Sequence, residues 1–191
     1  MTKKETHKLS AENFGETTGL SIYEPHGRYD GILWSVYKNK GASLALKTAS
    51  KLSVVLSIAA FCAVLGFYLY TGWIVASKLA IVCAVPFIVV SIFRRVLNTP
   101  RPYEILPFYG KAPKKKKGQS FPSRHVFSIF VIAASVSFVN LPLGIALAVL
   151  GVMLAVARVL LGIHFVKDVV AGALIGITSG VIGMLIANAI I

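Results

Sequence analysis

Long uncharged apolar runs alternate with short basic segments along most of this chain. The first two runs cover residues 52–77 and 79–93, and a last run covers residues 169–191. The run 126–157 is too long for one crossing of a hydrocarbon layer of about 30 Å, and Asn-Leu-Pro at 140–142 supplies a turn that divides it. The pattern therefore predicts an all-α membrane bundle with about five transmembrane helices.

The first 50 residues have a different character. They are polar and basic, and the first apolar run begins too late for a cleavable signal peptide, so we expect this tail to be retained. Residues 29–51 mix aliphatic and aromatic side chains with lysines, which is typical of an amphipathic helix lying in the membrane interface. We therefore predict a tail with a membrane-surface helix at 1–50 and a transmembrane domain at 51–191.

Composition excludes soluble and disordered proteins. Of 191 residues, 56% are hydrophobic and 14% are charged, and the mean hydropathy is +0.76. The net charge of +13 would also suit a nucleic-acid-binding protein, but the basic residues lie at membrane edges and form no recognisable reader module. We therefore expect the bilayer, and not nucleic acid, to be the partner of these charges.

The distribution of lysine and arginine predicts an orientation. All but one of the 20 Lys and Arg residues lie before the first run, between the second and third, or between the fourth and fifth. The exception, Lys78, lies between the first two runs. The positive-inside rule then places the N-terminus and both charged loops in the cytoplasm, in a multi-pass protein of the cell membrane.

Small residues mark a packing surface in the last run. Gly172, Gly176 and Gly180 recur every four residues, so a neighbouring backbone can approach closely. Such a stripe suits either a contact within the bundle or a homodimer, and the sequence leaves both open. Cys62 and Cys83 lie inside apolar runs without metal-ligand spacing, and we interpret both as packing residues.

The few ionisable residues near the apolar runs are candidates for a functional site. After Asp30 the chain contains only two acids, Glu104 and Asp168, and only two histidines, His125 and His164. All four lie in or beside the two loops that the charge pattern assigns to one face. Ionisable groups at the edge of an apolar bundle are costly to keep, so a functional role is the default hypothesis.

Three short segments carry this chemistry. His164 and Asp168 are four residues apart, so one helical turn would let the carboxylate accept a hydrogen bond from the imidazole and leave the other ring nitrogen free to attack. Ser123 lies near the predicted start of a helix, where free N–H groups attract an anion. His125, in the first turn, could donate a proton to a leaving oxygen.

Arginines complete the cluster. Arg94 and Arg101 are seven residues apart, about two helical turns, which predicts roughly one helix face, although Pro100 and Pro102 interrupt the last turn. Arg158 precedes His164. A group so rich in donors and so poor in acids suits phosphate, which guanidinium groups bind in bidentate fashion. One aspartate and two histidines leave too few ligands for a metal, so we expect neither a metal nor a cofactor.

These residues resemble the signature of the type 2 phosphatidic acid phosphatases, which share a core with vanadium haloperoxidases. The signature is a Lys, six residues and Arg-Pro; then Pro-Ser-Gly-His; then Ser-Arg, five residues, His, three residues and Asp. Order and spacing match in all three parts, and the resemblance covers about residues 52–191. The matching residues are Arg94, Arg101, Pro102, Pro122, Ser123, Arg124, His125, Ala157, Arg158, His164 and Asp168.

The resemblance implies a role for each position. His164 would be the nucleophile that forms a phosphohistidine, Asp168 would orient it, and His125 would be the general acid. The phosphate oxygens would be held by Arg94, Arg101, Ser123 and Arg158, without a metal.

This chain departs from the signature at three places. Arg94 replaces lysine, Ala157 replaces serine, and Arg124 replaces glycine where the backbone should approach phosphate. Arg124 is therefore either a further phosphate contact or a restriction on the substrate. The positions of His125, Arg158, His164 and Asp168 are unaltered, which favours an active enzyme.

The resemblance implies a membrane hydrolase, for which residues 51–191 would form the phosphatase domain. The substrate would be a lipid phosphate monoester or diphosphate, of the phosphatidate, phosphatidylglycerol phosphate or polyprenyl phosphate class. Two alternatives stay open: a lipid phosphotransferase that uses the same phosphohistidine, and a non-catalytic membrane protein that binds a lipid phosphate.

Overall fold

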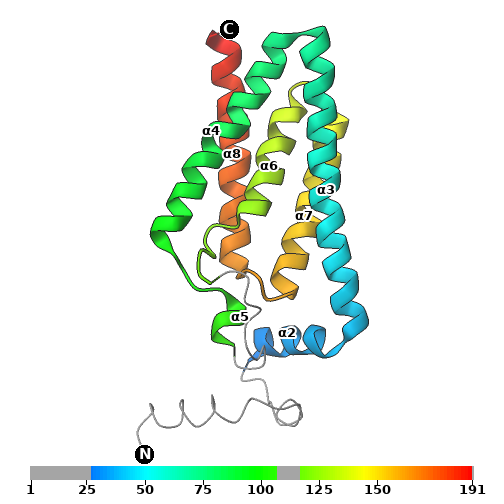
Figure 1. Ribbon diagram of the computed structural model, residues 1–191, viewed down its shortest axis with the longest axis vertical. Coiled ribbons are helices and arrows are strands. Elements are labelled where there is room, and N and C mark those ends of the chain that lie inside the picture. Colours follow the sequence, from blue (N-terminus) through cyan, green and yellow to red (C-terminus); the bar gives the residue numbers. More distant parts are fainter. Residues whose placement is uncertain (1–26, 107–116, 191) are drawn as a thin grey trace, which may run out of the picture.

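The computed structural model describes residues 27–106 and 117–190. Every regular element within these ranges is a helix, which confirms the all-α membrane bundle. Residues 1–26 and most of the lysine-rich loop lie outside the described residues. In Figure 1 the long helices run along the long axis, and a short helix near the start of the described chain lies across one end of them.

The predicted surface helix is shorter than its apolar and basic pattern indicated. Helix α2 covers Arg28–Lys38 and ends at Asn39, whose side chain accepts a hydrogen bond from the Ala42 N–H at 3.0 Å. This cap starts α3, which extends over Lys40–Thr71 as one helix of 32 residues. The expectation of a surface helix through residue 51 is therefore wrong, and the predicted domain boundary at 50/51 falls within α3.

The second turn also lies earlier than predicted. Helix α3 ends at Gly72, and α4 covers Trp73–Leu97. Lys78, predicted to lie in a loop, is inside α4 and donates a hydrogen bond to Asn188 Oδ1 at 3.0 Å. The uncharged run did not show this turn, because Gly72 lies among apolar residues on both sides.

The remaining helices follow the predicted order. The short α5 covers Pro102–Ile105, α6 covers Arg124–Ser137, α7 covers Leu141–Leu160 and α8 covers Val166–Ile190. Asn140 begins α7 by accepting a hydrogen bond from the Leu143 N–H at 3.0 Å. The predicted division of the long run at residues 140–142 is confirmed.

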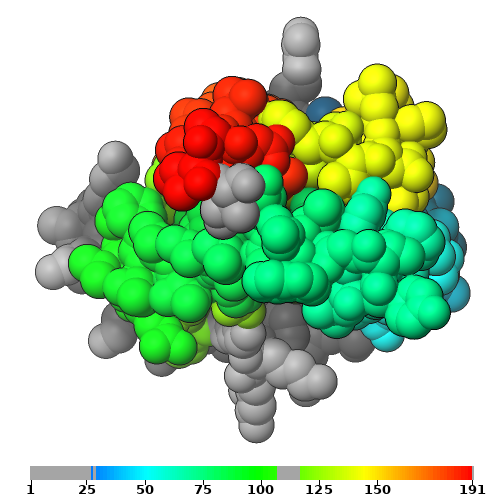
Figure 2. All heavy atoms as spheres, turned by 90° about the horizontal axis from the view of Figure 1, so that it is seen from above, coloured from blue at the N-terminus to red at the C-terminus, as the bar shows by residue number. Residues whose placement is uncertain are grey.

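Helix α6 lies in the centre of the bundle and is shorter than α3, α4, α7 and α8, which surround it. It has 14 residues, about 21 Å of helix, and Val126, Phe127 and Val136 are 0% exposed. The other four helices are long and apolar enough to cross a membrane. Figure 2 views the bundle from the end that carries the C-terminus. The α3–α4 turn, the first turn of α7 and the last turns of α8 cover this end.

The glycine stripe of α8 packs against α6. A Cβ added at Gly172 would lie 2.7 Å from Ser123 O, one at Gly176 would lie 2.6 Å from Phe127 O, and one at Gly180 would lie 2.9 Å from Val131 O. The predicted packing role is confirmed, and the contact is internal to the bundle. This stripe is therefore occupied within one chain and gives no support to a homodimer.

Candidate active site

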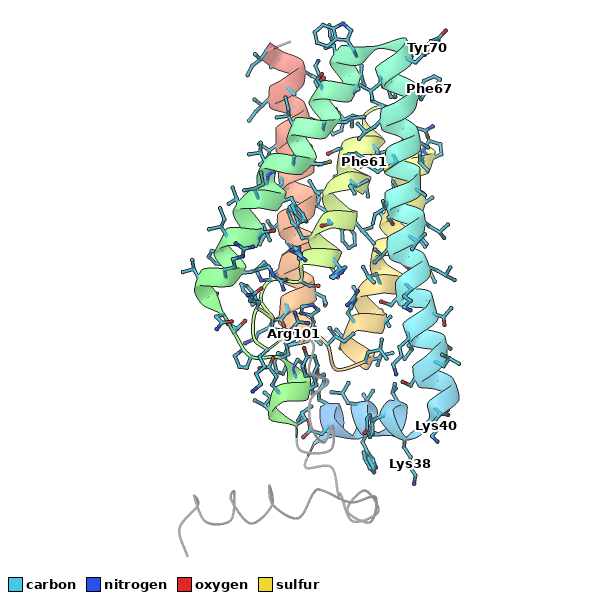
Figure 3. The ribbon with its side chains drawn as sticks, viewed as in Figure 1. Lys38, Lys40, Phe61, Phe67, Tyr70 and Arg101 are labelled. Carbon is cyan, nitrogen blue, oxygen red and sulfur yellow. The ribbon has the colours of Figure 1, made fainter. Side chains whose placement is uncertain are left out.

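The predicted site residues gather where α4 ends, α6 begins, α7 ends and α8 begins, which we call the site end. Arg94 belongs to the last turn of α4, His125 to the first turn of α6, Arg158 to the last turn of α7 and Asp168 to the first turn of α8. Figure 3 shows Arg101 at this end of the bundle and Tyr70 at the other. The three parts of the signature, at residues 94–102, 122–125 and 157–168, thus meet at one end of the bundle.

His164 and Asp168 lie together, but not on one turn of a helix. Helix α8 begins at Val166, so His164 belongs to the preceding turn. Its Nδ1 lies 3.6 Å from Asp168 Oδ2, beyond hydrogen-bond distance. The same carboxylate oxygen accepts hydrogen bonds from the Phe165 N–H at 3.0 Å and from the Ser120 hydroxyl at 2.5 Å. The predicted contact exists, but the spacing of four residues arises from a loop and the start of a helix.

Ser120 joins this pair, and sequence analysis missed it. Its side chain is 1% exposed, and its Oγ lies 3.3 Å from His164 Nδ1 as well as donating to Asp168. A hydroxyl can hydrogen-bond to both groups at once, since it has one proton and two lone pairs. The residues Ser120, His164 and Asp168 therefore form one buried cluster.

The environment of His164 favours a neutral imidazole. Burial lowers the pKa of His164 below its ordinary value of 6.5, and the positive charges of Arg101 and Arg94 act in the same direction. The interaction with the carboxylate of Asp168 opposes this shift in pKa without reversing it. At neutral pH the ring therefore keeps a lone pair on one nitrogen, as a nucleophile requires.

Arg94 and Arg101 support the segment that leads into α6. Arg94 donates hydrogen bonds to the carbonyl oxygens of Gln119 and Pro122, and Arg101 Nε donates to the Gly118 carbonyl at 3.0 Å. Both are buried, with 6% and 8% exposure. They do not lie on one helix face as their spacing indicated, because α4 ends at Leu97 and Arg101 is in extended backbone.

Two further residues hold this segment in place. Glu104 Oε1 accepts a hydrogen bond from the Gly118 N–H at 2.7 Å, and Thr99 accepts one at Oγ1 from the Phe121 N–H at 2.9 Å. Gly118 has a φ of +68°, and a Cβ there would lie 2.2 Å from Asn98 Oδ1, so a larger residue would strain the backbone and displace the Asn98 side chain. Glu104, noted only as a rare acid, thus supports the loop and leaves Asp168 as the carboxylate beside the histidine.

The start of α6 presents free donors. Ser123 is the N-cap residue, as predicted, and its N–H donates to the Asp168 carbonyl at 2.8 Å. Its hydroxyl does not cap the helix and is buried without a hydrogen-bond partner among the described residues. His125 follows in the first turn and is close enough to Arg158, Arg124 and Arg94 for their positive charges to act on it. The helix N-terminus and these cations together favour an anion.

Arg158 and Arg124 border this position from two sides. Arg158 Nε is buried and has no hydrogen-bond partner in the described part of the chain. The Arg124 guanidinium lies over the ring of Phe87, 5.5 Å from its centroid, which holds the side chain beside α4. A cation therefore lies where the family signature has glycine, and it is held against α4 by the ring of Phe87.

A cavity of about 490 Å³ lies elsewhere, between α3 and the α6–α7 turn. It is lined mainly by apolar side chains near Phe67 and Leu143, at the end opposite the site. None of the arginines or histidines reaches it, so it is not the candidate site. Among the described residues no group of three His, Cys, Asp or Glu side chains is placed to hold a metal ion.

Two solved structures share this fold. The crystal structure of LpxE from Aquifex aeolicus aligns with a TM-score of 0.61 and 24% identity, over 77% of this chain and 87% of that one. The first transmembrane PAP2 type phosphatidylglycerolphosphate phosphatase from Bacillus subtilis aligns with a TM-score of 0.64 and 18% identity, over 98% of this chain and 94% of that one.

Sequence comparison gives the family. The Bacitracin transport permease protein BcrC of Bacillus licheniformis is 28% identical over 105 residues, which are 53% of this chain and 52% of that protein. The chain thus matches about half the length of this relative. Residues 73–191, which include every residue predicted for the site, match the PAP2 superfamily. The chain therefore belongs to the PAP2 superfamily.

Proposed function

We propose that this protein hydrolyses a lipid phosphate monoester or diphosphate through a phosphohistidine on His164. The observation that carries the proposal is the convergence at the site end of a neutral buried histidine, its carboxylate partner and several arginines. A phosphoryl group in the middle of this cluster would meet a nucleophile and the positive charge that its transition state needs.

In the first step, Nε2 of His164 attacks phosphorus, the P–N bond forms and the bond to the leaving oxygen breaks. The leaving oxygen takes a proton from His125, whose protonated form is favoured by the negative charge of the bound phosphate. The carboxylate of Asp168, whose Oδ2 lies 3.6 Å from Nδ1 of His164, stabilises the positive charge that the ring acquires.

In the second step, water attacks the phosphohistidine from the side that the alcohol has left. His125, now neutral, accepts the proton of this water, the P–N bond breaks, and inorganic phosphate leaves. Both histidines return to their starting state, so the net reaction consumes one water for each phosphate released.

The phosphate oxygens would be held by donors that the fold leaves free. Ser123 Oγ and Arg158 Nε are buried without partners in the described ranges, which is costly unless a ligand uses them. Arg94 and Arg101 each use part of their donor set on the loop and keep further N–H groups. Arg124 would contact a second phosphate or a headgroup beyond the reacting phosphorus.

The membrane bundle and the relatives support this substrate class. A site at the end of transmembrane helices suits a lipid, and one structural neighbour is named as a phosphatidylglycerolphosphate phosphatase. We further propose that the site end faces the cytoplasm, because the exposed Lys38 and Lys40 lie there, as Figure 3 shows, whereas Lys78 lies in the first turns of α4, toward the other end.

Phosphate release by purified protein in detergent tests the proposal. The panel contains phosphatidate, phosphatidylglycerol phosphate and farnesyl diphosphate, with EDTA present. His164→Ala should abolish release while the protein still unfolds cooperatively on heating. Arg94→Ala and Arg95→Ala form a matched pair on adjacent positions of α4, one buried and one exposed. Only Arg94→Ala should lose activity.

The outcomes separate the alternatives. Labelled phosphate that stays on the protein in base, is released in acid and is absent from His164→Ala would support the phosphohistidine. Transfer to an added lipid alcohol in place of water would favour a phosphotransferase. Binding of a lipid phosphate without turnover, unaffected by His164→Ala, would overturn the proposal in favour of a binding protein. An impermeant thiol reagent that labels Lys38→Cys in intact cells, but not Trp73→Cys, would refute the cytoplasmic orientation.

A further inference from the structure

Helix α2 is docked against the site end of the bundle. Leu33 is 1% exposed, and Tyr29 lies one helical turn before it on the same face. Figure 1 shows α2 lying across the bundle close to the start of α3 and the α7–α8 connection. One face of this surface helix is thus covered by protein, near the site residues.

The ring of Tyr29 stacks on Phe165, the residue that follows His164. The ring centroids are 6.4 Å apart, and the ring planes are 26° from parallel. The backbone N–H of Phe165 donates to Oδ2 of Asp168. Tyr29 therefore packs on the short turn that presents both the nucleophile and its carboxylate partner, although the proposed reaction assigns it no role.

Two buried polar atoms near this turn lack partners. The Tyr29 hydroxyl and Oδ1 of Asp168 are both buried without a hydrogen bond among the described residues. Oδ2 of the same carboxylate has two donors, from Phe165 and Ser120. A phenol can donate and a carboxylate oxygen can accept, so these atoms are complementary. Leaving either one unsatisfied would be unfavourable.

The pKa of Tyr29 responds to the carboxylate of Asp168. The pKa of Tyr29 is raised to about 12, mainly by burial, then by the negative charge of Asp168 and after that by Asp30. None of the arginines contributes to this shift. Together with the stack on Phe165 and the buried hydroxyl, this places Tyr29 near the turn that presents His164 and Asp168.

We propose that Tyr29 is a positioning residue, whose hydroxyl donates through one bridging water molecule to Oδ1 of Asp168. The carboxylate would then be held at both oxygens, with Oδ2 directed to Nδ1 of His164. The inference rests on the proposed role of His164 as nucleophile. It extends the site beyond residues 73–191, to a helix outside the part of the chain that matches the family.

Removing only the hydroxyl tests this role. Tyr29→Phe keeps the ring that stacks on Phe165, and Tyr70→Phe makes the same change at the opposite end, where Tyr70 is 92% exposed. We expect Tyr29→Phe to lower kcat about tenfold, roughly 1.4 kcal/mol, with little change in KM or Tm. Tyr70→Phe should match the wild type in all three.

A second measurement does not depend on turnover. Diethyl pyrocarbonate modifies neutral imidazoles, and peptide mass spectrometry gives the rate at His164 separately from the other histidines. A carboxylate held at both oxygens keeps the ring oriented and basic. We therefore expect slower modification of His164 in Tyr29→Phe than in Tyr70→Phe, and an equal rate at His125.

The two measurements keep the inference apart from the proposed function. Slower modification of His164 in Tyr29→Phe supports positioning even if the wild type releases no phosphate, a result that would overturn the function alone. An unchanged kcat and an unchanged modification rate would overturn the positioning role. A raised KM with normal modification of His164 would also overturn it, because the hydroxyl would then contact the substrate.

Discussion

Replacing Gly172 by alanine tests how the packing of α8 sets the geometry of the site. The added Cβ would lie 2.7 Å from the Ser123 carbonyl oxygen and 3.3 Å from the Phe127 nitrogen. Both are backbone atoms of the α6 start, so no flexible side chain can move aside. Ordinary contact begins at 3.4 Å, so the two helices must separate by about 0.7 Å, the difference between 3.4 and 2.7 Å.

This displacement should affect both stability and catalysis. Overpacking of this kind costs about 1–3 kcal/mol, and for a chain of this length 1 kcal/mol lowers Tm by about 2–4 °C. The N-cap Ser123 would also move away from its N–H contact with the Asp168 carbonyl. A misplacement near 1 Å can lower a rate about 100-fold, so we expect kcat to fall roughly 10- to 100-fold.

Gly180→Ala is the matched control. Its Cβ would lie 2.7 Å from Ala134 Cβ and 2.9 Å from the Val131 carbonyl, a comparable overlap. Gly180 is eight residues further along α8, about 12 Å further from the site end than Gly172. Thermal unfolding in detergent and phosphate release should show similar losses of stability in both variants and a large loss of kcat in Gly172→Ala only. Equal activity losses, or a wild-type Tm and kcat in Gly172→Ala, would refute the reasoning.

Three further outcomes are expected. Ser120→Ala removes a hydrogen bond to a buried carboxylate, worth about 1.5–3 kcal/mol, so Tm should fall and kcat should fall roughly 10- to 100-fold; unchanged kinetics would show that the hydroxyl is dispensable. Because the pKa of His164 is lowered, protonation should inactivate the nucleophile only below pH 6.5, and Asp168→Asn should move this acidic limb of kcat/KM to still lower pH. Arg124→Gly should raise KM for a diphosphate more than for a monophosphate, and equal changes would remove Arg124 from substrate recognition.

Much of the architecture was predictable because apolar runs and turns are local signals. The turn at Asn140 and the cap position of Ser123 have side chains that act on their own backbone neighbours. The turn at Gly72 was missed, because a glycine between two apolar helices interrupts neither hydrophobicity nor charge. Asn39 was missed for a related reason: its cap divides a stretch in which apolar and basic residues continue on both sides.

The site shows a different limit. Arg94, Arg101, His164 and Asp168 could be named because ionisable residues are rare in this chain and their spacing matches a known signature. Ser120 could not, because serine is common and its role comes from a fold that brings it to His164, 44 positions away. The reason given for Arg94 and Arg101 was also wrong, since a left-handed residue at Asn98 ends the helix between them.

The shortness of α6 has a consequence for the surrounding lipid. Helix α8, with 25 residues, is about 37 Å long, whereas α6 is about 21 Å long and begins inside the bundle, as Figure 1 shows. Ser123, at the start of α6, packs against Gly172, which lies one to two turns along α8, so in the proposed reaction a phosphate must pass the first turns of α8 to reach His125. A thicker bilayer lengthens this path and a thinner one shortens it. Turnover should thus depend on the acyl-chain length of the host membrane even when the substrate itself is unchanged.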